Sequence, residues 1–216
     1  MFDATRREIG ERTLVSRRLL ALIQSLEHSR TLETAAHKGL IFVQLYGVYE
    51  YAVRSAVQAM LSAIRTDGLC ARDLHYQVLT LVLDPGFISA ASSGRRACWG
   101  KRSALLQGSD STAPLVSLAD TAFPADGSHY RVRQLHTIWE VFGLSVPVLP
   151  EPRLAGRIEE LVENRNAIAH GRRTPEEVGG RYSTSEIDKS ITDIESVATY
   201  VVTAMETHYH GGGVRR

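Results

Sequence analysis

The sequence of 216 residues contains few cysteines, few lysines and no long apolar run. Cys70 and Cys98 stand 28 positions apart without CxxC spacing, which argues against a disulfide framework and against a zinc site. The charged N-terminal residues 1–12 lack the apolar core of a signal peptide. Apolar runs such as residues 19–23 and 39–43 are too short to cross a bilayer. We therefore expect a cytoplasmic protein with no membrane-spanning segment.

The positive charge comes almost entirely from arginine. Only Lys38, Lys101 and Lys189 are lysines among the 25 basic residues, and the net charge is +1. A guanidinium group suits bidentate phosphate contacts better than an ammonium group does. High genomic GC content produces the same excess of arginine, so the composition leaves a phosphate-binding role and a compositional origin both open.

The apolar residues recur at helical spacing over most of the chain, and no pair of strands is evident. The pattern predicts an all-α fold, an up-and-down helical bundle in one domain at residues 1–210, with a flexible tail at residues 211–216. Thr184 or Ser185 is expected to cap the last helix. The other helices are predicted at residues 3–29, 32–65, 69–83, 128–143 and 153–170.

A long irregular insertion is expected at about residues 85–128. Asp84-Pro85-Gly86 reads as a stop signal for the preceding helix, and the stretch that follows is rich in Ser, Gly, Ala and Asp. Its basic residues surround Trp99 and could clamp a single strand of RNA. A solvated loop held by one tryptophan is the alternative. The basic residues are Arg95, Arg96, Lys101 and Arg102.

One short segment carries the candidate chemistry. Residues 165–171 read Arg-Asn-Ala-Ile-Ala-His-Gly. The spacing of Arg165 and His170 alone has little value, because Arg131 and His136 have the same spacing within an ordinary amphipathic stretch. The context separates the two pairs: a polar asparagine, small apolar residues and a terminal glycine accompany only the first.

This segment resembles the signature of HEPN domains, helical proteins in which an arginine, a polar residue and a histidine form a metal-independent RNase site. The likeness covers residues 161–171, and residues 39–50 are similar to the long second helix of the RiboL-PSP-type HEPN branch, where a Leu-Tyr pair and a glutamate recur. The resemblance implies that Arg165, Asn166 and His170 are catalytic, and that no metal and no cofactor is needed. It also implies a two-fold homodimer in which both motifs face one cleft.

The chemistry of these residue types agrees with RNA cleavage through the ribose 2′-hydroxyl. His170 can move a proton near neutral pH, Arg165 can stabilise the charged phosphorus centre, and Asn166 can position phosphate, ribose or histidine. Positions five apart lie about 140° apart around an ideal helix. A site therefore requires that the helix end near the glycine, or that a second chain complete it. Arg172 and Arg173 could extend the RNA-binding surface or simply favour a helix C-terminus.

Other features have ordinary structural interpretations. Glu159 and Glu163 fit an exposed acidic face better than a metal site, and His208 and His210 fit a chance pair. Core packing is favoured over base stacking for the aromatic residues of the second helix, which are Phe42, Tyr46, Tyr49 and Tyr51.

The leading hypothesis is therefore a metal-independent endoribonuclease that acts as a toxin or an antiviral defence effector, with an antitoxin or defence-system partner. A non-catalytic HEPN-like module that binds RNA, a nucleotide or a protein partner is the alternative. A third possibility is a structural motif in which Arg165 pairs with an acid such as Glu163 and His170 caps the helix.

Overall fold

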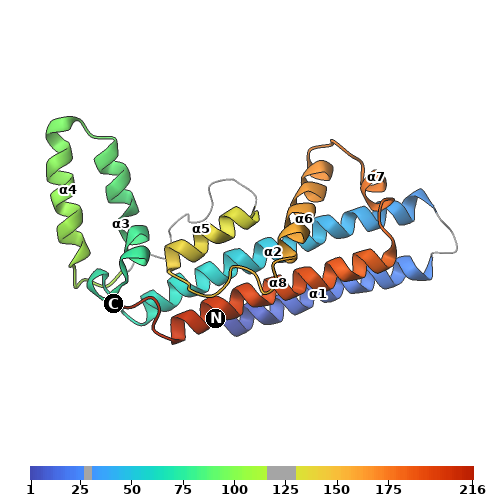
Figure 1. Cartoon of the computed structure of the whole chain (residues 1–216), viewed down its shortest axis with the longest axis horizontal. Coiled ribbons are helices and arrows are strands. Elements are labelled where there is room, and N and C mark those ends of the chain that lie inside the picture. Colours follow the sequence, from blue (N-terminus) through green and yellow to red (C-terminus); the bar gives the residue numbers. More distant parts are fainter. Residues whose placement is uncertain (27–30, 116–129) are drawn as a thin grey trace. The chain divides into compact units, whose positions relative to one another are not determined.

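A computed structural model describes residues 1–26, 31–115 and 130–216. Within these ranges every regular element is a helix, which confirms the all-α class (Figure 1). The helices are α1 (Phe2–Ser25), α2 (Leu32–Thr66), η1 (Ala71–Asp73), α3 (Tyr76–Ala91), α4 (Arg95–Ser109), α5 (Val132–Phe142), α6 (Leu154–Ala169), α7 (Pro175–Gly179) and α8 (Thr184–His210).

The chain forms two compact units, where the sequence predicted one helical domain with an insertion. The first unit comprises residues 1–56, 129–135 and 147–203 and contains α1, most of α2, α6, α7 and most of α8. The second comprises residues 57–128, 136–146 and 204–216 and contains α3, α4 and most of α5. Helices α2, α5 and α8 contribute to both units, and each unit is described by itself below.

Helix α1 buries a stripe of residues three or four positions apart, which is the spacing of one helix face. Leu14 and Leu26 are apolar but do not belong to this stripe, since they are 45% and 50% exposed. Three of the seven buried positions are Thr or Ser, whose short side chains allow a neighbouring helix to approach closely. The buried residues are Phe2, Thr5, Ile9, Thr13, Ser16, Leu20 and Ile23.

Helices α1 and α2 pack antiparallel, as the sequence predicted. The Arg12 guanidinium lies over the Tyr51 ring at 4.1 Å, and Ser16 Oγ donates to Gln44 Oε1 at 3.4 Å, so contacts move down α2 as they move up α1. Helix α1 also contacts α8, since Arg17 Nη2 lies 2.7 Å from Glu195 Oε2. The predicted core role is confirmed for the three most buried aromatic residues of α2, which are Phe42, Tyr46 and Tyr49.

The termini of the helices follow local capping chemistry. The C-terminus of α2 falls at Thr66, one residue past the predicted end, and Gly68 follows at φ +65°. Ser183 caps α8, since its hydroxyl accepts from the Glu186 N–H while the Glu186 carboxylate accepts from the Ser183 N–H. The cap predicted at Thr184 or Ser185 was therefore wrong by one or two residues. The same capping box, formed by Thr174 and Glu177, begins α7. The residue pattern had not predicted this short helix.

The predicted boundaries of the region at 69–128 were wrong over its described part. Helix α3 begins at Tyr76 and continues through Asp84-Pro85-Gly86 to Ala91, and α4 covers residues 95–109 where an irregular insertion was expected. Pro85 removes one helical hydrogen bond without ending the helix. Gly86 lies close to α4, since a Cβ there would lie 2.4 Å from Leu105 Cδ2. Residues 116–129 of the expected insertion lie outside the described residues.

The C-terminal residues, expected to form a flexible tail, are bound to the segment that precedes α3. His75 N donates to Val214 O at 2.9 Å, and Val214 is fully buried. Arg216 N donates to Asp73 O, also at 2.9 Å. These backbone bonds hold the tail in the second unit. Among the described helices, none is both long and apolar enough to cross a membrane.

Candidate functional site

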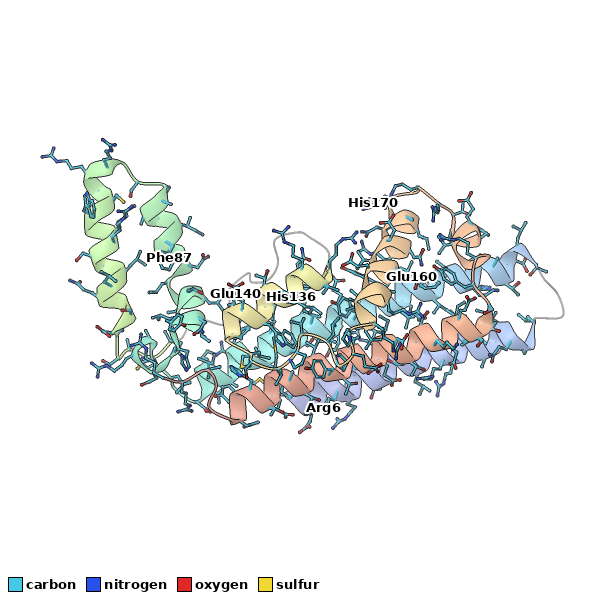
Figure 2. The ribbon with its side chains drawn as sticks, in the orientation of Figure 1. Arg6, Phe87, His136, Glu140, Glu160 and His170 are labelled. Atoms are coloured by element: carbon cyan, nitrogen blue, oxygen red, sulfur yellow. The ribbon has the colours of Figure 1, made fainter. Side chains whose placement is uncertain are left out.

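The candidate motif lies at the C-terminal end of α6, in the first unit. His170 is the C-cap residue, with φ −97° and ψ 9°, and its N–H donates to Asn166 O at 3.0 Å. Gly171 follows with φ +66°, a left-handed conformation that suits glycine, and turns the chain away from the helix. The helix thus ends at the motif. The spacing of Arg165 and His170 required either such an end or a second chain to complete the site. The His170 side chain is exposed at this end of α6 (Figure 2).

Arg165 is held in place from two sides. Its Nη1 donates to the side-chain oxygen of Asn166 at 3.0 Å, and its guanidinium carbon lies 4.6 Å from the centroid of the Tyr46 ring. Asn166 is only 6% exposed, whereas Arg165 is half-buried. Asn166 therefore contacts both partners of the motif, Arg165 through its side chain and His170 through its backbone carbonyl. In this arrangement Asn166 is a positioning residue.

Tyr46 is a contact of the site that residue patterns alone did not reveal. It is 2% exposed on α2. Burial, and then the neighbouring Glu50 carboxylate, raise the pKa of Tyr46, against a hydrogen bond with the backbone of Tyr130 and the nearby charge of Arg165. The phenol stays neutral, and its ring face supports the guanidinium. The only signal in the sequence was the Leu-Tyr pair that carries the HEPN resemblance.

A search of family models matches residues 7–208 with the HEPN_MAE_28990-like HEPN family. The chain belongs to this family. The predicted HEPN membership is confirmed. The family that matches is the MAE_28990-like one, and the branch that residues 39–50 were found to resemble is the RiboL-PSP-type one. A search of curated proteins and a search of solved structures found no match. HEPN domains are often RNases, and they often dimerise and bind RNA.

Acidic residues beside the HEPN motif are paired with arginines. Arg131, at the N-terminal end of α5, forms an ion pair with Glu159 and lies 3.8 Å from Glu163. Arg172 Nη1 lies 2.9 Å from Glu163 Oε1, and this hydrogen bond lowers the pKa of the Glu163 carboxyl, with smaller contributions from the charges of Arg131 and Arg173. Arg131, which shares its spacing with the motif, therefore has a structural role. Across the described ranges no group of three His, Cys, Asp or Glu side chains is placed to hold a metal ion.

A second polar network holds the segment that follows the HEPN motif. Asn164 is 3% exposed, and its Nδ2 donates to Tyr182 Oη at 2.8 Å. Tyr182 Oη in turn donates to Glu160 Oε1 at 2.9 Å, while Lys38 Nζ donates to the Tyr182 carbonyl at 2.8 Å. This network links α6 and α2 to the chain just before α8. Asn164 adjoins Arg165 in the sequence, but nothing in the pattern pointed to Tyr182.

The predicted RNA-binding arginines near the HEPN motif differ in their surroundings. Arg172 is occupied by Glu163, as described above. Arg173 is exposed, and within the described part of the chain it has no ion-pair partner. Of the two, Arg173 is thus better placed to receive a phosphate.

The remaining predicted RNA contacts lie on α4 of the second unit. Lys101 Nζ donates to the carbonyl and hydroxyl oxygens of Ser89, at 3.0 and 2.9 Å. The Arg102 guanidinium lies 5.0 Å from the Trp99 ring centroid. Arg95 and Arg96 are exposed at the start of the helix. Their contact with RNA stays a prediction.

Proposed function

We propose that this HEPN protein is a metal-independent endoribonuclease. The observation that carries the proposal is the end of α6, where an exposed histidine follows an arginine that is oriented by Asn166 and by the ring of Tyr46. Histidine is the side chain that transfers protons near neutral pH, and arginine is suited to a phosphate whose charge increases in the transition state. Both residues belong to one compact unit.

In the proposed reaction the ribose 2′-oxygen attacks the adjacent phosphorus and the bond from phosphorus to the 5′-oxygen breaks. The 2′-hydroxyl loses a proton and the leaving 5′-oxygen gains one, so the products are a 2′,3′-cyclic phosphate and a 5′-hydroxyl. His170 carries out one of these transfers, and Arg165 stabilises the pentavalent phosphorus centre. Arg173 contributes to binding of a neighbouring phosphate.

The proposal includes a homodimer. Two proton transfers are needed, and each chain contributes one His170 at the motif. A two-fold dimer in which both motifs face one cleft supplies two imidazoles and two guanidiniums to the same RNA. Specific activity should then fall when the protein is diluted below the concentration at which sedimentation shows dissociation. A dilution series with constant specific activity through that range would contradict the composite site.

The setting that we propose is a toxin or an antiviral defence effector in the cytoplasm, controlled by an antitoxin or another defence-system partner. Cleavage of cellular RNA is harmful to the host cell, so an RNase of this kind requires such control. Expression of the wild-type chain should arrest growth, whereas the His170→Ala variant should not. Equal growth of cells that express the wild type and cells that express His170→Ala would contradict the toxin role. It would not contradict the proposed RNase activity.

The decisive experiment is an RNA cleavage assay with purified protein, with and without EDTA. We expect His170→Ala and Arg165→Ala to lower the rate by about 100-fold or more, and product ends to be 2′,3′-cyclic phosphates. His136→Ala is the matched control, because Arg131 and His136 share the motif's spacing and His136 is exposed on α5. Unchanged cleavage by His170→Ala, or complete loss of activity in EDTA, would refute the mechanism.

The same experiment identifies the non-catalytic alternative. If the wild-type protein binds RNA, a nucleotide or a protein partner but never turns RNA over, and Arg165→Ala weakens that binding, the chain is a HEPN binding module. If Arg165→Ala lowers only the free energy of unfolding, the motif is structural. Asn166→Ala should lower cleavage less than Arg165→Ala under the RNase proposal, since the guanidinium loses one of its two contacts and keeps the Tyr46 ring.

A further inference from the structure

Helices α3 and α4 of the second unit lie side by side as an antiparallel hairpin (Figure 1). Their side chains line an apolar groove of about 670 Å³. Its walls come from successive turns of the two antiparallel helices. The large apolar residues that line it are Leu79, Leu83 and Phe87 of α3 and Leu105 and Leu106 of α4. Figure 2 marks Phe87 on α3.

This groove presents apolar side chains to solvent. Phe87 is 48% exposed and Leu106 is 74% exposed, and α4 buries none of its residues. An exposed and continuous apolar surface of this kind is typical of a site for another molecule. Residues of both helices line the groove over several turns. Helix α3 has 16 residues, which corresponds to a length of about 24 Å.

The two charged side chains that line the groove are both basic. From residue 76 to residue 109 the chain carries four basic residues and a single acid, Asp84. Arg102 of α4 and Arg216 of the C-terminus both line the groove, and among the described residues that line it there is no acid. The Arg216 Nε donates to Leu74 O beside the start of α3, so this cation lies at one end of the groove, whereas Arg102 lies further along α4.

We propose that this groove binds an amphipathic helix of a partner protein whose polar face is acidic. An apolar stripe would pack between the two walls, and carboxylates on its flanks would meet Arg102 and Arg216. A second copy of this chain would bring two sets of these cations together, which like-charge repulsion disfavours. A bilayer is flat and does not fill a groove between two helices, and RNA phosphates gain nothing from walls of leucine and phenylalanine.

The inference does not depend on the RNase proposal, because the groove belongs to the second unit and the HEPN motif to the first. The probe is a labelled 16-residue helical peptide with leucines at i, i+3, i+4 spacing and glutamates on the remaining faces. The full-length protein is titrated into it and followed by fluorescence anisotropy. The control peptide has lysine in place of each glutamate.

We expect saturable binding of the acidic peptide that weakens as salt rises, and none of the basic peptide. Leu106→Glu should weaken binding by about tenfold or more. Ile88→Glu is its matched control, because Ile88 is 62% exposed on the same hairpin but does not line the groove. Arg102→Glu should also weaken binding, whereas Arg65→Glu, an exposed cation elsewhere in the same unit, should not.

Equal affinity of wild type and Leu106→Glu for the acidic peptide would overturn the inference, as would the absence of saturable binding. The inference would also be overturned if the acidic peptide did not bind and Leu106→Glu instead abolished another interaction of the protein. The interactions to test are self-association, binding to vesicles with anionic headgroups and binding to single-stranded RNA. Since Leu106 is 74% exposed, its replacement leaves the fold intact, and circular dichroism checks this.

Discussion

The guanidinium of Arg165 lies over the ring of Tyr46, with 4.6 Å between Cζ and the ring centroid. The ring is fixed on α2, where Tyr46 is 2% exposed, and its neighbour Tyr49 is fully buried with a hydroxyl that makes no hydrogen bond to the described residues. A second contact, to Asn166, fixes the guanidinium from its own helix. An arginine oriented before substrate arrives loses less conformational entropy on binding phosphate.

Removal of the Tyr46 ring should lower RNA cleavage without abolishing the fold. Tyr46→Phe keeps the ring and should retain activity within about twofold, whereas Tyr46→Leu should lower kcat/KM by about fivefold, because a cation–π contact of this kind contributes about 1 kcal/mol. Phe42→Leu is the control for a cavity at a buried ring on the same helix. Equal losses of activity in Tyr46→Leu and Phe42→Leu would show that the ring acts only through packing.

The two arginines after the motif should contribute unequally to RNA affinity. Arg173→Ala should weaken binding of a short RNA and reduce its salt dependence by about one counterion. Arg172→Ala should have a smaller effect, because Arg172 is paired with Glu163 at 2.9 Å. Filter binding at several salt concentrations, in the His170→Ala background to prevent cleavage, measures both. A larger effect of Arg172→Ala would reverse this assignment.

Two glycines of α2 should respond in opposite directions to alanine. A Cβ at Gly39 would lie 2.0 Å from the carbonyl oxygen of Pro175 in α7, and this oxygen is backbone that cannot rotate away. Gly39→Ala should therefore lower the free energy of unfolding by about 1–3 kcal/mol. At Gly47 the space is open, so Gly47→Ala should raise it by up to about 1 kcal/mol. Urea denaturation compares them, and a neutral Gly39→Ala would show that α7 can move.

His208 should make the stability of the protein depend on pH. Burial lowers the pKa of His208, against hydrogen bonds with the backbone of Phe142 and Gly213. Because the folded pKa lies below that of the unfolded chain, which is about 6.5, the unfolded state binds the proton first as pH falls. The contribution of His208 to the free energy of unfolding is therefore present above about pH 6.5 and is lost progressively as the pH falls below it.

The measurement is urea denaturation of wild type and His208→Gln at pH 7.5 and pH 5.5. The fall in unfolding free energy between these pH values should be smaller in the variant, which cannot bind a proton at this position. Glutamine retains an N–H for the bond to Phe142 O, so the comparison isolates the charge. The same fall in both proteins would contradict the prediction.

The sequence by itself determined the elements whose signals are local. Helical periodicity located α2 and α6 to within one residue at each end, because glycines at positions 68 and 171 provide the left-handed turns that stop a helix. It also determined the motif at 165–171, because the identities of adjacent residues define it. The geometry of a helix left two alternatives for a site, an end of α6 near Gly171 or completion by a second chain, and α6 does end there.

Only the tertiary structure decided what depends on distant neighbours. Asp84-Pro85-Gly86 is a turn signal in the sequence, yet α3 passes through it and packs along α4. Likewise, no local pattern places the ring of Tyr46 beneath Arg165, 119 positions away in the chain. Propensity is a preference of about 1 kcal/mol per residue, which contacts between helices exceed. For this reason the sequence identified the residues of the candidate site, and the packing of α2 on α6 decided how they are held.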